Sequence, residues 1–120
     1  MLVNGRNSDT LPVLDRGLLY GDGLFETIAC IDGQMPLWER HMARLSRGCH
    51  RLGIRMPSQE LLASEAASLV TARRQVLKIL VTRGEGGHGY FPGDGARTPS
   101  GSTCAGRGSR KDRRLPASRA

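Results

Sequence analysis

The chain has 120 residues, which is enough for one small domain with a modest hydrophobic core. It contains no apolar run of about 18 residues, which excludes a transmembrane helix, and it begins without the basic and apolar segments of a secretory signal. Its three cysteines, Cys30, Cys49 and Cys104, are widely spaced. They predict neither a metal site nor a disulfide framework, and they fit a reducing cytoplasm.

The net charge of +7 is concentrated at the C-terminal end of the sequence. Residues 95–120 carry seven basic residues and one acid, whereas residues 1–94 are nearly neutral, with 11 basic and 10 acidic residues. The basicity is therefore a property of residues 95–120 and not of the body of the protein. Those residues contain one large aliphatic side chain, Leu115, and too little apolar surface to offset the entropy cost of ordering. We expect them to form a disordered basic tail.

The first elements in chain order are predicted strands. Residues 1–3 form a short apolar strand, which Asn4 and Gly5 turn. Residues 24–31 form a second strand, rich in large apolar and β-forming residues. Asp32-Gly33 then predicts a tight hairpin turn, because both residues tolerate positive φ, and residues 34–37 are expected to return.

Two helices and a third strand follow. Apolar residues spaced by four and three predict a helix over residues 37–52 that ends at Gly53; they are Trp38, Met42, Leu45, Cys49 and Leu52. Ser58 is the expected N-cap of a second helix over residues 58–73. Residues 76–82 read as a strand and residues 84–90 as a glycine-rich loop. Strands mixed with two helices predict an α+β domain over residues 1–94.

Several apparent site motifs have simpler interpretations. Gly84-x-Gly86-x-x-Gly89 matches the dinucleotide fingerprint in letters, but the Phe-Pro-Gly that follows opposes the helix which that site requires. No Gly-Lys-Ser/Thr sequence of a P-loop occurs, and no two histidines have the i, i+4 spacing of a helical metal site. On periodicity alone, Arg44 would be a solvated helix arginine beside the apolar stripe.

The segment from Asp15 to Thr27 is harder to explain as an ordinary loop. It reads DRGLLYGDGLFET, in which glycines, acids and large apolar residues alternate directly before a strand. Such a mixture is typical of a tightly turned loop that holds functional residues on a rigid scaffold.

This segment resembles the opening signature of the fold-type-IV enzymes dependent on pyridoxal 5′-phosphate (PLP). The resemblance covers residues 1–94 and includes Ile31-Asp32-Gly33, the helix segment HMARL and the strand-loop that ends in Thr82-Arg83-Gly84. It implies the small N-terminal domain of that class IV aminotransferase-like fold. The glycine loop and the short N-terminal start are most similar to the aminodeoxychorismate lyases of this family.

The resemblance also implies roles for particular residues. The arginine of the HMARL segment, Arg44, would grip the phosphate of PLP, since a guanidinium offers a permanent charge in a bidentate fork. Phe25 would line the substrate side, and His88 and Tyr90 would lie where relatives bind the substrate carboxylates. The family usually has arginine where His88 stands, so a weaker grip on carboxylates is expected here.

The implied reaction is a PLP-dependent elimination in folate biosynthesis. It converts 4-amino-4-deoxychorismate to 4-aminobenzoate and pyruvate, in a cytoplasmic enzyme that is a homodimer in full-length relatives. The alternative within the family is a class IV aminotransferase acting on branched-chain or D-amino acids. The opening signature separates these two activities weakly.

The catalytic lysine of the family is not matched in this sequence. Its two lysines are Lys78, in the strand expected over residues 76–82, and Lys111, in the basic tail, and neither has the family's Schiff-base context. We therefore predict that this chain alone is inactive as a lyase, with no catalytic residue of its own. The loss of similarity near Asp94 suggests a reading-frame shift as the origin of residues 95–120.

A hypothesis from another class is a non-enzymatic fragment that binds nucleic acid through the tail. Clustered arginines would bind phosphates without sequence preference and with strong salt dependence. Residues 95–120 contain no aromatic side chain for base stacking, which weighs against this hypothesis.

Overall fold

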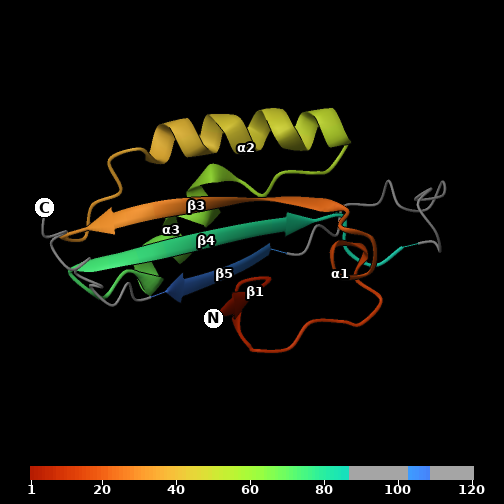
Figure 1. Ribbon diagram of the computed structural model, residues 1–120, viewed down its shortest axis with the longest axis horizontal. Helices are drawn as coiled ribbons and strands as arrows, with labels where there is room; N and C mark the ends of the chain where they lie inside the picture. Colours follow the sequence, from red (N-terminus) through yellow and green to blue (C-terminus); the bar gives the residue numbers. More distant parts are fainter. Residues whose placement is uncertain (87–102, 109–120) are drawn as a thin grey trace, which may run out of the picture.

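The computed structural model describes residues 1–86 in full and the backbone of residues 103–108. The strands of this part form one antiparallel sheet in the order β2-β1-β5-β4-β3 (Figure 1). Their bounds are β1 Leu2–Val3, β2 Arg6–Asn7, β3 Gly23–Ile31, β4 Arg74–Thr82 and β5 Thr103–Gly108. The predicted turn at Asn4-Gly5 is confirmed, because both residues have positive φ and join β1 to β2.

The long strands β3 and β4 pair over their whole length, from Gly23 opposite Thr82 to Ile31 opposite Arg74. Asp32 and Gly33 have positive φ, as the predicted turn requires. The returning strand predicted for residues 34–37 is wrong, because only an isolated bridge between Ile31 and Gln34 forms. Pro36 lacks the N–H that would continue such a ladder, and the chain enters a helix at once.

Both predicted helices are present. Helix α2, Trp38–Leu52, ends at Gly53 in the left-handed conformation, and helix α3, Gln59–Leu69, begins after Ser58, whose side chain accepts from the N–H of Leu61. Helix α3 is shorter than predicted at its C-terminal end. A short helix that the sequence did not predict, α1 Arg16–Tyr20, lies in the loop before β3. None of the helices in the described part is long and apolar enough to cross a membrane.

Helices α2 and α3 cover the same face of the sheet, and among the described residues neither of these helices covers the other face (Figure 1). The core consists of buried side chains from both helices, from alternate positions of β3 and β4, and from the segment that joins α2 to α3. These are Ile28, Cys30, Met42, Leu45, Cys49, Ile54, Leu62, Ala66, Leu77, Ile79 and Val81. The alternation along β3 places one unexpected residue, Glu26, on the covered face beside Ile28 and Cys30.

The strand β5 differs from the prediction of a disordered tail. Thr103–Gly108 pairs antiparallel with both β4 and β1 and so lies inside the sheet, beyond the predicted domain boundary at residue 94. Main-chain hydrogen bonds supply this pairing, so a segment without large apolar residues can join strands that the core already positions. Residues 95–102 and 109–120, to which the prediction also applied, lie outside the described residues.

Candidate functional site

The signature loop before β3 is fixed by a buried aspartate. Asp15 is fully buried, and its Oδ1 accepts from the backbone N–H of Gly17 at 2.8 Å, which starts helix α1. Its Oδ2 accepts from the hydroxyl of Thr82 at 2.9 Å. The same hydroxyl oxygen accepts from the N–H of Gly84 at 3.1 Å. The carboxylate therefore joins the loop to the end of β4 with both of its oxygens satisfied.

A second aspartate joins the loop to helix α2. Asp22 Oδ2 accepts from the Nε of Arg16 at 2.9 Å and from the Nε of Arg83 at 2.8 Å. Arg83 also donates to two carbonyls at the C-terminal end of α2, that of Leu52 at 2.7 Å and that of the C-cap residue Gly53 at 3.2 Å. Burial alone would raise the pKa of Asp22, but hydrogen bonds and charge from the two arginines outweigh it and lower the pKa. One arginine thus links β4, the loop and the C-terminus of α2.

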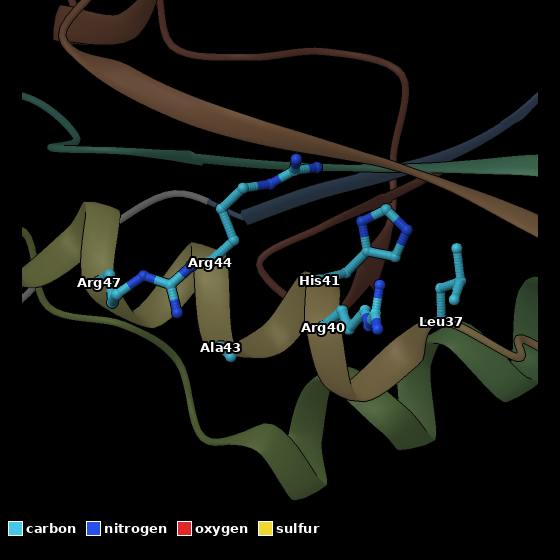
Figure 2. A pocket seen from close by; sticks show the side chains of 6 residues that line it. All are labelled: Leu37, Arg40, His41, Ala43, Arg44 and Arg47. Carbon is cyan, nitrogen blue, oxygen red and sulfur yellow. The ribbon is translucent and has the colours of Figure 1, made fainter.

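A shallow hollow of about 410 Å³ runs along α2, and most of its lining is basic. Figure 2 shows Arg44 and His41 extending from the helix toward the strands. The lining residues come from successive turns of α2 and from its N-cap residue; they are Leu37, Arg40, His41, Ala43, Arg44 and Arg47. No described side chain in that list is acidic, so the hollow suits an anion.

Arg44 is held in this hollow by Glu26 of β3. Its Nε donates to Glu26 Oε1 at 2.7 Å and its Nη2 donates to Oε2 at 2.6 Å, a bidentate pair. The Arg44 side chain is 65% exposed, whereas that of Glu26 is 4% exposed. His41 Nδ1 lies 2.7 Å from the same Oε2. The hydrogen bond from Arg44 lowers the pKa of Glu26, against the opposing effect of burial and with further help from His41.

Phe25 lies on the opposite face of β3 from Glu26. Its ring is exposed, and the ammonium nitrogen of Lys78 on β4 lies 4.4 Å from the ring centroid. Phe25 also lines a separate hollow of about 230 Å³, together with Gly17, Gly21, Gly23, Leu24 and Leu80. In the described part of the chain, Phe25 and Arg44 thus line two different hollows. His88 and Tyr90, the other predicted site residues, lie outside the described residues.

Neither Glu26 nor His41 was predicted as a site residue from the sequence. A signal was available for Glu26, because it is two residues before Ile28 and four before Cys30 and so lies on the same face of the strand as these apolar residues. A carboxylate on a covered strand face needs a cationic partner, and helix arginines beside the apolar stripe are the available ones. The described part of the chain contains no group of three or more His, Cys, Asp and Glu residues placed to bind a metal ion.

The described part of the chain thus combines long paired strands, two helices on one face of the sheet and an arginine-lined hollow along α2. A model of the amino-transferase class IV family matches residues 23–105, and the chain belongs to this family. The solved 4-amino-4-deoxychorismate lyase of Pseudomonas aeruginosa is 45% identical, with a TM-score of 0.74, over 92% of this chain and 40% of that one.

Two further relatives belong to the same family. The aminodeoxychorismate lyase of Vibrio harveyi is 35% identical over 91 residues, which are 75% of this chain and 34% of the relative. A Methanocaldococcus jannaschii protein, assigned provisionally as a branched-chain-amino-acid aminotransferase, is 36% identical over 98 residues, again 75% of this chain and 34% of the relative. The chain thus spans between a third and two fifths of the length of these relatives.

Proposed function

We propose that the hollow along α2 holds the phosphate group of PLP, with Arg44 as its principal ligand. The supporting observation is the orientation of the guanidinium. Arg44 uses Nε and one hydrogen of Nη2 on Glu26, so Nη1 and the second hydrogen of Nη2 remain without a partner in the described part of the chain. That remaining edge is a second fork, and forks of this kind bind phosphate oxygens in pairs.

The surrounding residues fit a phosphate. Arg40 and Arg47 line the same hollow, one turn of helix on either side of Arg44. Together with Arg44 they place three permanent positive charges against the single negative charge of Glu26. The hollow therefore keeps a net attraction for an anion although Arg44 already has an acidic partner.

The activity that we propose for the whole enzyme is aminodeoxychorismate lyase, which releases 4-aminobenzoate and pyruvate from 4-amino-4-deoxychorismate. The 45% identity with the Pseudomonas aeruginosa lyase over most of this chain supports it. When bound, PLP supplies an electron sink for elimination. In this proposal the residues of α2 anchor and orient the cofactor, and Phe25 forms a wall of the substrate side, with His88 and Tyr90 near the substrate carboxylates.

The other parts of the proposal follow from the resemblance to the family. The enzyme would be a cytoplasmic homodimer, and a class IV aminotransferase is the second candidate activity, favoured by the Methanocaldococcus jannaschii relative. Lys78, the lysine of the described part, has its ammonium nitrogen over the ring of Phe25 on the face of the sheet that α2 and α3 do not cover. We propose that it does not carry the cofactor, and we expect no turnover from this chain by itself.

A binding experiment on the chain tests the phosphate site. Pyridoxamine 5′-phosphate and pyridoxamine differ only in the phosphate, so the ratio of their dissociation constants, measured by calorimetry, isolates its contribution. We expect the phosphate to tighten binding about tenfold or more, and Arg44→Ala to bring the ratio close to one. Arg73→Ala is the matched control, because Arg73 is an arginine that also pairs with a carboxylate, that of Asp32. A ratio unchanged by Arg44→Ala refutes the phosphate site.

A chimera tests the lyase assignment. Residues 1–108, which include β5, would replace the corresponding segment of the Pseudomonas aeruginosa lyase. We expect the chimera to release 4-aminobenzoate from 4-amino-4-deoxychorismate. A folded, PLP-bound chimera that transfers amino groups to keto acids without releasing 4-aminobenzoate would support the aminotransferase instead.

A further inference from the structure

Glu26 occupies a position where a carboxylate is costly. It lies on the helix-covered face of β3 between β4 and α2, with its side chain 4% exposed, and it follows the same alternation as the core residues Ile28 and Cys30. An apolar residue at this position would extend the core without any desolvation of charge. The presence of a glutamate here therefore calls for a role that apolar packing does not supply.

Both oxygens of Glu26 are directed at α2. Oε1 accepts from Arg44 Nε, and Oε2 is shared between Arg44 Nη2 and His41 Nδ1. An ionised carboxylate can only accept hydrogen bonds, so Nδ1 of His41 carries the hydrogen in this contact. The lowered pKa keeps Glu26 ionised at neutral pH. The carboxylate thus engages two side chains from one turn of the same helix.

The strand that carries Glu26 is a rigid support. Glu26 lies opposite Ile79 within the continuous β3–β4 ladder, whereas Arg44 is a long side chain with most of its surface in solvent. A free arginine loses much rotamer freedom when it binds a ligand, and a bidentate partner removes part of that freedom in advance. The pairing selects one edge of the guanidinium and leaves the other edge for a ligand.

We propose that Glu26 is a positioning residue that pre-orients Arg44 for the cofactor phosphate, with His41 holding the carboxylate in place. The inference rests on the proposed phosphate site. Glu26 does not contact the phosphate in this arrangement, and it acts through Arg44. The pair persists when phosphate binds, so the anion receives the Nη1 edge of a guanidinium already fixed by the sheet.

The sign of one substitution separates positioning from a simple charge effect. The negative charge of Glu26 opposes the binding of an anion, so its removal by Glu26→Gln would strengthen phosphate binding if charge alone mattered. The glutamine amide cannot accept from both Nε and Nη2, because one of its two heteroatoms is a donor. If positioning dominates, Glu26→Gln lowers the ratio of the dissociation constants of pyridoxamine and pyridoxamine 5′-phosphate by about three- to tenfold.

Glu26→Asp provides the complementary variant. It keeps the charge but shortens the side chain by one methylene, which breaks contacts of 2.6 and 2.7 Å from a fixed strand. Positioning predicts a loss similar to that of Glu26→Gln, whereas a charge effect predicts wild-type binding. Glu65→Gln is the control, because Glu65 is a partly buried glutamate of α3 for which the described part shows no arginine partner.

The wild-type chain offers a further measurement that does not require the Glu26 variants to fold. The Nε–H of Arg44, assigned by its absence in Arg44→Lys, would be followed by nuclear magnetic resonance during titration with inorganic phosphate. We expect this signal to remain protected from exchange, because the Glu26 pair persists. A signal that loses protection on phosphate binding would show that phosphate displaces Glu26, and it would overturn the inference.

The outcomes distinguish this inference from the proposed function. If Arg44→Ala abolishes the phosphate-dependent ratio while Glu26→Gln and Glu26→Asp leave it unchanged or increase it, the positioning role is wrong and the phosphate site stands. If Arg44→Ala itself leaves the ratio unchanged, the phosphate site is wrong. Retention of the ratio in Glu65→Gln, with its loss in both Glu26 variants, supports the positioning role.

Discussion

Gly17→Ala should destabilise the chain severely, because the signature loop has no room for a β-carbon at this position. A Cβ built on Gly17 would lie 2.7 Å from Thr82 Cβ and 2.9 Å from Asp15 Oδ1, and it would overlap the Thr82 methyl group. Thr82 cannot move aside freely, because its hydroxyl bonds to Asp15 and accepts from Gly84. Overpacking costs about 1–3 kcal/mol, and each lost hydrogen bond costs about 1 kcal/mol.

The expected loss for Gly17→Ala is therefore about 3–5 kcal/mol, a large part of the roughly 5–15 kcal/mol that stabilises a small domain. Thermal unfolding followed by circular dichroism should show a midpoint lowered by roughly 10 °C or more. Thr82→Ser removes the methyl group but keeps the hydroxyl, so Gly17→Ala should cost less in that background. A midpoint lowered by less than about 3 °C in Gly17→Ala, or equal costs in both backgrounds, would refute this packing argument.

Two further predictions concern the charged contacts. Asp22 and Glu26 have pKa values lowered in the folded state, so their stabilisation is complete above the unfolded-state values of about 4 and is lost as the pH falls through the folded values. The urea concentration at the unfolding midpoint should decrease as the pH is lowered below about 4, and it should decrease less steeply in Asp22→Asn. Equal dependence on pH in the wild type and in Asp22→Asn would contradict the role given to Asp22. Arg83→Gln should lower the free energy of unfolding by about 1–3 kcal/mol, because it removes the contacts to Asp22 and the α2 carbonyls. Arg51→Gln, an exposed control on α2, should change it by less than about 0.5 kcal/mol, and similar losses in both would count against the contact.

The parts of the fold that the sequence predicted are those set by local patterns. The apolar stripe of α2 predicted three fully buried residues, Met42, Leu45 and Cys49, and Gly53 and Ser58 marked helix ends by their backbone and capping chemistry. Leu52, the last residue of the predicted stripe, lies at the end of α2 and is 45% exposed. Periodicity identifies the apolar face of a helix, but it does not say how far each residue on that face is buried.

The parts that it could not predict depend on contacts between distant segments. The partner of β3 is β4, across more than 40 residues that contain both long helices, and nothing local distinguishes this pairing from the short hairpin at Asp32. Strand β5 was missed because main-chain pairing inside a sheet does not require large apolar side chains. At the site, Arg44 was predicted from the resemblance, but its pairing with Glu26 required the register of β3 against α2.

Helix α2 is attached to the sheet in two ways that serve different purposes. Apolar packing of Met42, Leu45 and Cys49 supplies the cohesion, but this packing tolerates small rotations about the helix axis. Polar contacts at two points along the helix do not tolerate them: Glu26 holds Arg44 near the middle, and Arg83 binds the carbonyls of the last turn. An exposed arginine adds little stability through such a pair, so stability does not explain the buried glutamate. The proposed phosphate site offers an explanation through orientation: the same two contacts set the direction in which α2 presents its arginines, and a bidentate grip on phosphate would depend on that direction.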